Sequence, residues 1–331
     1  MSGESADVYF ARAERVLERE GLDPVVSMEV FSREAGILCG IDEAKNLLAH
    51  ALADDPPGSA TIEALDDGDA FEAKEIVLRI TARYRQFGLY ETAMLGMLAQ
   101  STGWATAARE CVEVANPAPV ICFGARHVHP DVTDVLDYAA IVGGCVGAST
   151  PAGARLAGHA PTGTMPHSLV LIFGDTVLAA EAFDRDLEPD VPRIVLIDTF
   201  KDEAEEALRV AHALGDRLYG IRLDTPSERG RVTADLVKEI RARLDLEGFQ
   251  HVKIVVSGGL SPDRITYFKE AEAPVDSYAV GSYISGAAPI DFTGDIKEID
   301  GQPIAKRGRI PGRTASPRLR PVDLAAWRAS V

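Results

Sequence analysis

Four short polar motifs occur in the second half of the sequence, and each could bind part of a phosphorylated substrate. They are Asp198-Thr199, Arg222 with Asp224, Ser257-Gly258-Gly259 and Gly281-Ser282. A glycine turn lets backbone N–H groups approach an anion closely, and an arginine can hold a phosphate or carboxylate through two parallel hydrogen bonds. A carboxylate can bind ribose hydroxyls or Mg²⁺, or stabilise positive charge on a ribosyl ring. Together they predict an anion-binding catalytic site.

Each motif also has an ordinary structural explanation. The glycines of Ser257–Leu260 and Val280–Ser282 could form tight strand-to-helix turns, and Asp198 could cap the next helix. Arg222 and Asp224 could simply pair with each other on a polar rim. The two glycine turns count for more together, because the last two strands of an α/β barrel often form a phosphate site.

Single residues upstream add further candidates. His167, in the run GTMPHS, could act as acid, base, nucleophile or metal ligand, although a lone histidine is more often structural. Arg126 could clamp an anion or be a plain surface arginine. His127 and His129 have no evident third partner, so a metal triad is not favoured. Tyr9, without further context, is expected to be an ordinary core residue of an amphipathic helix.

The elements that must position the four motifs alternate between strand and helix. Strands are expected at 192–200, 217–224, 251–259 and 275–282, with helices at 201–216, 228–248 and 261–273. This alternation predicts parallel strands with right-handed crossovers. All strand ends of a parallel barrel lie on one face, and that face carries the active site.

The rest of the chain predicts earlier barrel units and a second domain. We expect a strand at 118–130, a small-residue helix at 141–150, and a further barrel unit in 159–175. Residues 1–112 read as an α+β domain, 113–286 as the barrel and 287–331 as a segment that returns to the first domain. The tail 291–309 alternates around an Asp-Gly turn and predicts a hairpin that docks on that domain. Linker-like composition occurs at 54–59 and 311–321.

Composition excludes some partners. The formal net charge is -17, and such a field repels nucleic acid and anionic membranes. No apolar run reaches the ~18 residues of a membrane span, and the N-terminus lacks the apolar stretch of a signal peptide, so we expect a cytoplasmic protein. The cysteines lack CxxC spacing and are expected to be buried free thiols: Cys39, Cys111, Cys122 and Cys145.

The order of the motifs resembles the nicotinate phosphoribosyltransferases. DVYF, LYETAMLGML, FGARHVHP, GCVGAST, TGTMPHS, LIDTF, RLDT, SGGL and VGSYI follow one another between about residues 7 and 309. The resemblance implies an irregular parallel α/β barrel of the type II phosphoribosyltransferase kind, with an α+β domain formed by both chain ends. It implies transfer of 5-phosphoribosyl from phosphoribosyl pyrophosphate to nicotinate, giving nicotinate mononucleotide and pyrophosphate in NAD biosynthesis. It also implies Mg²⁺ and, in many members, coupled ATP hydrolysis.

The same resemblance implies roles for individual residues. His167 matches a histidine that is phosphorylated during ATP coupling, and Asp198 and Asp224 are expected beside the ribose. Arg222 matches a residue around the base and ribose, and Arg126 a cation near the base or pyrophosphate. Thr164 is also expected to bind substrate.

The resemblance also assigns the phosphate site and an aromatic contact. The 5-phosphate binders are Ser257, Gly258, Gly259, Gly281 and Ser282. Tyr9 matches an aromatic that covers the pyridine ring, often from the neighbouring subunit, which implies a homodimer with shared active sites.

Departures from the family pattern keep alternatives open. The run after Asp224 is TPSERG, where many members continue with Ser-Gly-Asp. Quinolinate, with a second carboxylate, would demand more Arg and Lys around the base. Nicotinamide would suit an acid where Met165 stands. A barrel lyase or isomerase would need a Schiff-base lysine or a glutamate base at a strand end, and none is evident. A non-catalytic sensor of pyridine nucleotides is a third class.

Overall fold

The computed structural model describes residues 4–53 and 59–329, so most of the linker-like stretch 54–59 lies outside the described residues. The chain forms two compact units, residues 1–106 with 288–331, and residues 107–287. The first boundary falls inside helix α4 (Glu91–Ala115). Within the described residues, no helix has both the length and the apolar character to span a membrane.

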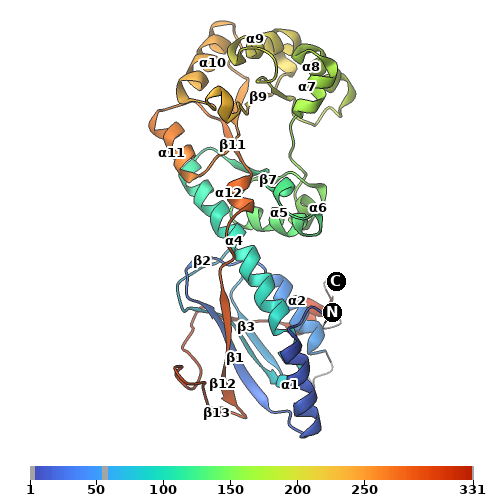
Figure 1. The fold of residues 1–331 in the computed structure, drawn as a ribbon, viewed down its shortest axis with the longest axis vertical. Helices are drawn as coiled ribbons and strands as arrows, with labels where there is room; N and C mark the ends of the chain where they lie inside the picture. The colour runs from blue at the N-terminus through green and yellow to red at the C-terminus, as the bar shows by residue number, and fades with distance from the viewer. Residues whose placement is uncertain (1–3, 54–58, 330–331) are drawn as a thin grey trace. The chain divides into compact units, whose positions relative to one another are not determined.

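An antiparallel sheet organises the first unit (Figure 1), in the order β13-β12-β1-β5-β3-β14. Its strands are β1 (Val25–Ser32), β3 (Thr61–Ala64), β5 (Ile76–Arg83), β12 (Phe292–Ile299), β13 (Gln302–Pro303) and β14 (Arg320–Pro321). The predicted tail hairpin is present, because Asp300 and Gly301 turn β12 into β13 with positive φ angles of 50° and 74°. β12 then pairs with β1, so both chain ends build one sheet, as predicted.

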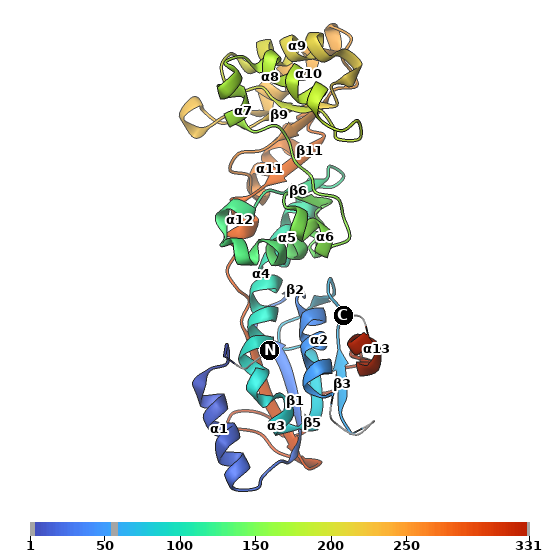
Figure 2. The ribbon, with the colours of Figure 1, turned by 90° about the vertical axis from the view of Figure 1, so that its right-hand side faces the viewer.

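Helices complete the first unit. They are α1 (Val8–Arg19), α2 (Ile41–Ala51), α3 (Tyr84–Phe87), the first part of α4, and α13 (Leu324–Ala329), and a small ladder joins β2 (Gly36–Ile37) to β4 (Ala70–Phe71). Met94 and Leu98 of α4 belong to the same buried cluster as Met28 and Ile80 of the sheet. Figure 2 shows α13 beside α2, which it contacts.

A buried ion pair fastens the C-terminal segment to this sheet. Glu29 of β1 is 1% exposed, and Arg79 of β5 donates to its Oε1 at 2.9 and 2.8 Å. The backbone N–H of Thr314 donates to the same oxygen at 2.9 Å. A buried carboxylate needs such partners, because an unpaired charge away from water is costly.

Six parallel strands form the second unit, in the order β7-β6-β11-β10-β9-β8. They are β6 (Val120–Cys122), β7 (Gly147–Ala148), β8 (Ile194–Leu196), β9 (Gly220–Leu223), β10 (Lys253–Val256) and β11 (Ser277–Val280). The helices are α5 (Thr133–Val142), α6 (Pro151–Leu156), α7 (His167–Phe173), α8 (Thr176–Asp186), α9 (Glu203–Leu214), α10 (Ala234–Leu246), α11 (Pro262–Glu270) and α12 (Ser282–Ser285). Figure 1 shows α8 to α11 around the strands, which curl as an open half-barrel, so the predicted irregular α/β barrel is confirmed.

Local sequence explains where these helices begin. Asp202 accepts hydrogen bonds from the N–H groups of Ala204 and Glu205 at the start of α9. Thr233 and Ser261 cap α10 and α11 in the same way. These caps satisfy N–H groups that the helix itself leaves unpaired, and they fix the residue at which each helix begins after its strand and loop.

The prediction of a small-residue helix at 141–150 is wrong. Helix α5 ends at Val142, and Gly147–Ala148 forms strand β7 beside β6. Gly144 has a φ of 112°, which a helix cannot contain. A Cβ on Gly147 would stand 2.5 Å from Oγ1 of Thr162, so the small residues here permit close approach of chain segments rather than helix formation.

Candidate active site

Two hollows that share four residues open at the strand ends of the second unit. The first, of about 370 Å³, is called the glycine hollow and is lined by Phe123, Ala125, Arg126, His127, Ser149, Gly163, Thr164, Pro166, Arg222, Asp224, Ser257, Gly258, Gly259, Ala279, Gly281 and Ser282. The second, of about 560 Å³, is called the histidine hollow and is lined by Arg126, His167, Leu171, Asp198, Thr199, Asp224, Thr225, Pro226, Ser227, Arg231, Gly258 and Gly259. The structure therefore brings together every predicted site residue except Tyr9.

Arg222 is held on three sides at the end of β9. Its Nε donates to Oγ of Ser257 at 2.9 Å, Nη1 to Oγ1 of Thr164 at 2.7 Å, and Nη2 to Oδ2 of Asp224 at 2.7 Å. The ring of Phe123 lies 5.1 Å from the guanidinium carbon. The salt bridge considered as an alternative does form, yet both partners line the glycine hollow, so Arg222 also orders three site residues.

The glycines of the two turns are required by space and by backbone conformation. Gly258 and Gly259 have φ angles of 88° and 62°, and a Cβ on Gly258 would stand 2.9 Å from Oδ1 of Asp224. A Cβ on Gly281 would stand 3.0 Å from the carbonyl oxygen of Phe123. Side chains at these positions would fill the space in which an anion could approach the backbone.

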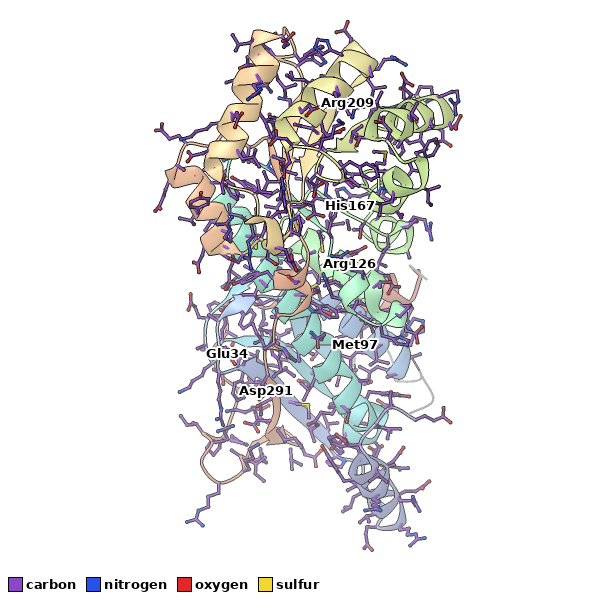
Figure 3. All side chains as sticks on the ribbon, turned by 45° about the horizontal axis from the view of Figure 1, so that its top comes forward. Glu34, Met97, Arg126, His167, Arg209 and Asp291 are labelled. Atoms are coloured by element: carbon purple, nitrogen blue, oxygen red, sulfur yellow. The ribbon has the colours of Figure 1, made fainter. Side chains whose placement is uncertain are left out.

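His167 pairs with a buried carboxylate. Its Nε2 lies 3.3 Å from both Oδ1 and Oδ2 of Asp198, whose side chain is 1% exposed. This hydrogen bond raises the pKa of His167 from its ordinary value of 6.5, although burial acts in the opposite direction. Asp198 is not the cap of α9, because Asp202 takes that position. Figure 3 labels His167, the first residue of α7, and Arg126.

Arg126 is the exposed cation common to both hollows. It lies in a short turn, Ala125–His127, after β6. His127 lines the glycine hollow, with its Nδ1 3.1 Å from the hydroxyl of Ser285, and Nδ1 of His129 accepts from the N–H of Asp131. In residues 4–53 and 59–329, no group of three or more His, Cys, Asp or Glu side chains gathers as metal ligands. Asp198 and Asp224 line the histidine hollow and supply carboxylate oxygens, the ligands that Mg²⁺ takes in proteins, while the binding of Mg²⁺ stays a prediction.

Tyr9 belongs to the first unit, apart from this set. It is 57% exposed on α1, and its hydroxyl donates to Oδ2 of Asp7 at 3.2 Å. Partial desolvation, first, and the hydrogen bond to Asp7, second, raise the pKa of Tyr9 above its ordinary value of 10.0. Its predicted contact with the pyridine ring stays a prediction.

Arg231, Phe123 and Ser149 are among the lining residues that the sequence did not predict. Arg231 lies in the loop after Asp224 where the chain departs from the family pattern, and that departure was the available signal. Phe123 and Ser149 carried none, because an apolar strand residue and a loop serine are common in any fold.

Comparison with known proteins identifies the family. The chain matches the family models described as quinolinate phosphoribosyl transferase, N-terminal domain, over residues 7–102, and C-terminal domain, over residues 104–295. The chain belongs to the quinolinate phosphoribosyl transferase family. The expected membership among the pyridine phosphoribosyltransferases is thus confirmed. The matched family is named for quinolinate, whereas the sequence motifs indicated the nicotinate enzymes.

Individual relatives agree with this family. A solved nicotinate-nucleotide pyrophosphorylase from Pyrococcus furiosus is 41% identical, with a TM-score of 0.86 over 94% of this chain and 79% of that one. A nicotinate phosphoribosyltransferase of Mycobacterium tuberculosis is 30% identical over 76% of this chain and 55% of its own length. The chain thus spans about half the length of the curated relatives it matches. The human nicotinic acid phosphoribosyltransferase structure, at 18% identity and a TM-score of 0.70 over 93% of this chain and 77% of that one, supports the fold alone.

Proposed function

We propose that this protein transfers the 5-phosphoribosyl group from phosphoribosyl pyrophosphate to a pyridine carboxylate, with release of pyrophosphate, in NAD biosynthesis. The observation that carries the proposal is the joint arrangement of two glycine turns, two arginines and a carboxylate around one hollow: Gly258–Gly259, Gly281, Arg126, Arg222 and Asp224. The turns suit the phosphate of the ribosyl donor, and the arginines suit the carboxylate of the base or the diphosphate.

The residue types fit the chemistry of ribosyl transfer. Departure of pyrophosphate leaves an oxocarbenium-like carbon, which a nearby carboxylate such as Asp224 stabilises. The ring nitrogen of the base is already a nucleophile, so no protein nucleophile is needed. Mg²⁺ would neutralise part of the charge on the leaving group. Positioning and electrostatics would therefore supply most of the rate.

Two bases have support. The matched family models are named for quinolinate and together cover 7–102 and 104–295, which supports quinolinate. The curated relatives are named for nicotinate. The site also supports nicotinate, because Arg222 is already engaged by Thr164 and Asp224, which leaves Arg126 as the arginine of the glycine hollow for a single base carboxylate. The family models therefore favour quinolinate over nicotinate, whereas the sequence motifs favoured nicotinate over quinolinate.

ATP coupling and the dimer are finer parts of the proposal. His167 lies in the histidine hollow with its Nε2 beside Asp198, an arrangement that would orient a nucleophilic imidazole. We place the transferable phosphate of ATP on this histidine. The homodimer with Tyr9 contributed by a neighbouring copy belongs to the same proposal.

The decisive assay incubates the purified chain and Mg²⁺ with phosphoribosyl pyrophosphate and quinolinate, nicotinate or nicotinamide, with and without ATP. Mononucleotide and pyrophosphate should form in equal amounts with one of the two carboxylates. Gly259→Asp, which places a carboxylate in the phosphate site, should abolish the activity. Failure to form a mononucleotide with any of the three bases would refute the proposed function. If the rates do not depend on ATP, only the coupling role of His167 is refuted, and ribosyl transfer stands.

A further inference from the structure

The loop between β9 and α10 contains an arginine in a backbone conformation that arginine rarely adopts. Gly230 has a φ of 94°, and Arg231, the next residue, has a φ of 66°. Glycine takes this left-handed region freely, whereas a side chain with a Cβ makes it unfavourable. A strained residue of this kind persists only where the surrounding structure imposes it, and such residues gather at functional sites.

The surrounding structure does impose the conformation of Arg231. The N–H of Arg231 donates to the carbonyl of Pro226 at 3.1 Å, which closes the loop on itself. Near the start of the loop, Oγ1 of Thr225 donates to the buried carboxylate of Glu203 at 2.8 Å. Near its end, Nη2 of Arg264 donates to the carbonyl of Val232 at 2.8 Å, and Val232 is buried. Both ends of the loop are therefore anchored, and the position of the Arg231 backbone is set.

The anchored backbone directs the Arg231 side chain to the glycine turn. Arg231 lines the histidine hollow together with Gly258 and Gly259. A Cβ on Gly259 would stand 3.8 Å from Nη1 of Arg231, so the guanidinium lies over the glycine. Within the part of the chain that the structure describes, no carboxylate pairs with Arg231, in contrast to Arg222, which is paired with Asp224. The guanidinium of Arg231 is therefore available to an anion that enters the histidine hollow.

The choice of ligand follows from which hollow Arg231 lines. The phosphate that the two glycine turns can hold belongs in the glycine hollow, between Gly258–Gly259 and Gly281. Arg231 lines only the other of the two hollows, together with Arg126. Neither arginine has a carboxylate partner within residues 4–53 and 59–329. Two such cations facing one space suit a ligand of higher charge than a phosphate monoester, and the diphosphate of the ribosyl donor is such a ligand.

We propose that Arg231 binds the pyrophosphate group of phosphoribosyl pyrophosphate, with its guanidinium held over Gly259 by the anchored loop 225–233. This inference rests on the proposed function. It assigns the leaving group, rather than the 5-phosphate, to a residue of the loop between β9 and α10. Arg231 would neutralise charge on the leaving diphosphate as the bond to the ribosyl carbon breaks.

The test measures binding by calorimetry at fixed ionic strength for three ligands, phosphoribosyl pyrophosphate, pyrophosphate alone and nicotinate mononucleotide, each with Mg²⁺. Arg231→Gln should weaken the first two about 10- to 100-fold, the loss expected for one charge-assisted contact. Binding of the mononucleotide, which carries the 5-phosphate but no diphosphate, should change less than about threefold, a shift too small for the loss of such a contact. Arg231→Lys should give an intermediate loss, because lysine keeps the charge but not the planar fork.

Two further variants separate binding from structure. Arg231→Gly removes the left-handed strain and should unfold at the same temperature as the wild type or higher, yet bind pyrophosphate as poorly as Arg231→Gln. Arg229→Gln, two positions away, lines a neighbouring hollow and not the histidine hollow, so it is the matched control for loss of charge and should bind all three ligands normally.

The outcomes distinguish this inference from the proposed function. If the wild type binds phosphoribosyl pyrophosphate, and Arg231→Gln binds it equally well, the role of Arg231 is refuted while ribosyl transfer stands. A loss confined to the mononucleotide would also refute it, because the 5-phosphate would then be the ligand. If the wild type binds neither phosphoribosyl pyrophosphate nor pyrophosphate, both proposals fail together.

Discussion

The pair formed by His167 and Asp198 shows how a site can depend on single residues that are ordinary by themselves. In the sequence, His167 is a lone histidine and Asp198 a strand-end carboxylate that could cap a helix. In the structure Asp198 is buried, both its oxygens lie 3.3 Å from Nε2 of His167, and Asp202 caps α9 instead. The buried carboxylate thereby orients the imidazole and favours its protonated form.

The hydrogen bond from Asp198 leads to a prediction about pH. Asp198→Asn should lower the pKa of His167, because the bond that raises it is lost while burial, which lowers it, remains. The measurement is an NMR titration of the histidine ring protons, with Asp202→Asn as the control that leaves the pKa of His167 unchanged. An unaltered pKa in Asp198→Asn would contradict the pairing.

The same bond sets the direction of the pH dependence of stability. The folded-state pKa of His167 is raised, so the stabilisation from this pair is fully present below the ordinary value of 6.5 and is lost as pH rises through the folded-state pKa. The difference in unfolding free energy between the wild type and Asp198→Asn should therefore be larger at pH 6 than at pH 8.

At the scale of elements, the short segment from α5 to α6 carries Ser149 to the glycine hollow. Asp137 of α5 is fully buried, and its Oδ2 accepts from the N–H of Thr150 at 3.0 Å and from its hydroxyl at 2.7 Å. Thr150 in turn caps α6 by accepting from the N–H of Gly153. One carboxylate therefore fixes the turn between strand β7 and the next helix, where the sequence pattern predicted continuous helix.

Asp137→Ala should destabilise the protein by about 1–3 kcal/mol, because it leaves the N–H and hydroxyl of Thr150 without their acceptor in a buried place. Asp137→Asn should cost less, since the amide oxygen can still accept. Denaturant unfolding provides the measurement, and Asp235→Ala, an exposed helix position, should change the stability by no more than about 0.5 kcal/mol. Equal stability of Asp137→Ala and the wild type would show that this carboxylate does not hold the turn.

At the scale of the whole molecule, the chain leaves its first unit within α4, builds the parallel half-barrel, and returns to add β12 beside β1. The candidate site lies in the second unit, whereas Tyr9 lies in the first. The side chain of Tyr9 is exposed, as are those of Val8 and Val16 on the same helix. An exposed aromatic on an element with no buried residue suits a contact with another molecule, in agreement with the proposed shared site.

Tyr9→Ala should raise the KM for the pyridine base with a smaller effect on kcat, because the ring is proposed to bind the base rather than to take part in the reaction. Tyr9→Phe should keep the wild-type KM, and Val16→Ala is the matched control on α1. Mixing Tyr9→Ala chains with Gly259→Asp chains should recover part of the activity if the two residues act in one site from different copies. An unchanged KM would mean that Tyr9 has no contact with the base.

The features that could be predicted from the sequence are those set by neighbouring residues. Alternating apolar runs and glycine turns after strands were enough to predict the parallel strands and a phosphate site at their ends. The order of the motifs added the phosphoribosyltransferase family. The features that needed the folded structure are contacts between distant residues. Asp198 meets His167, Arg222 meets Thr164, and Arg231 lies over Gly259 only because the order and curl of the strands bring those segments together. Periodicity and composition act over a few residues, whereas these distances depend on how whole strands pack, which no local pattern encodes.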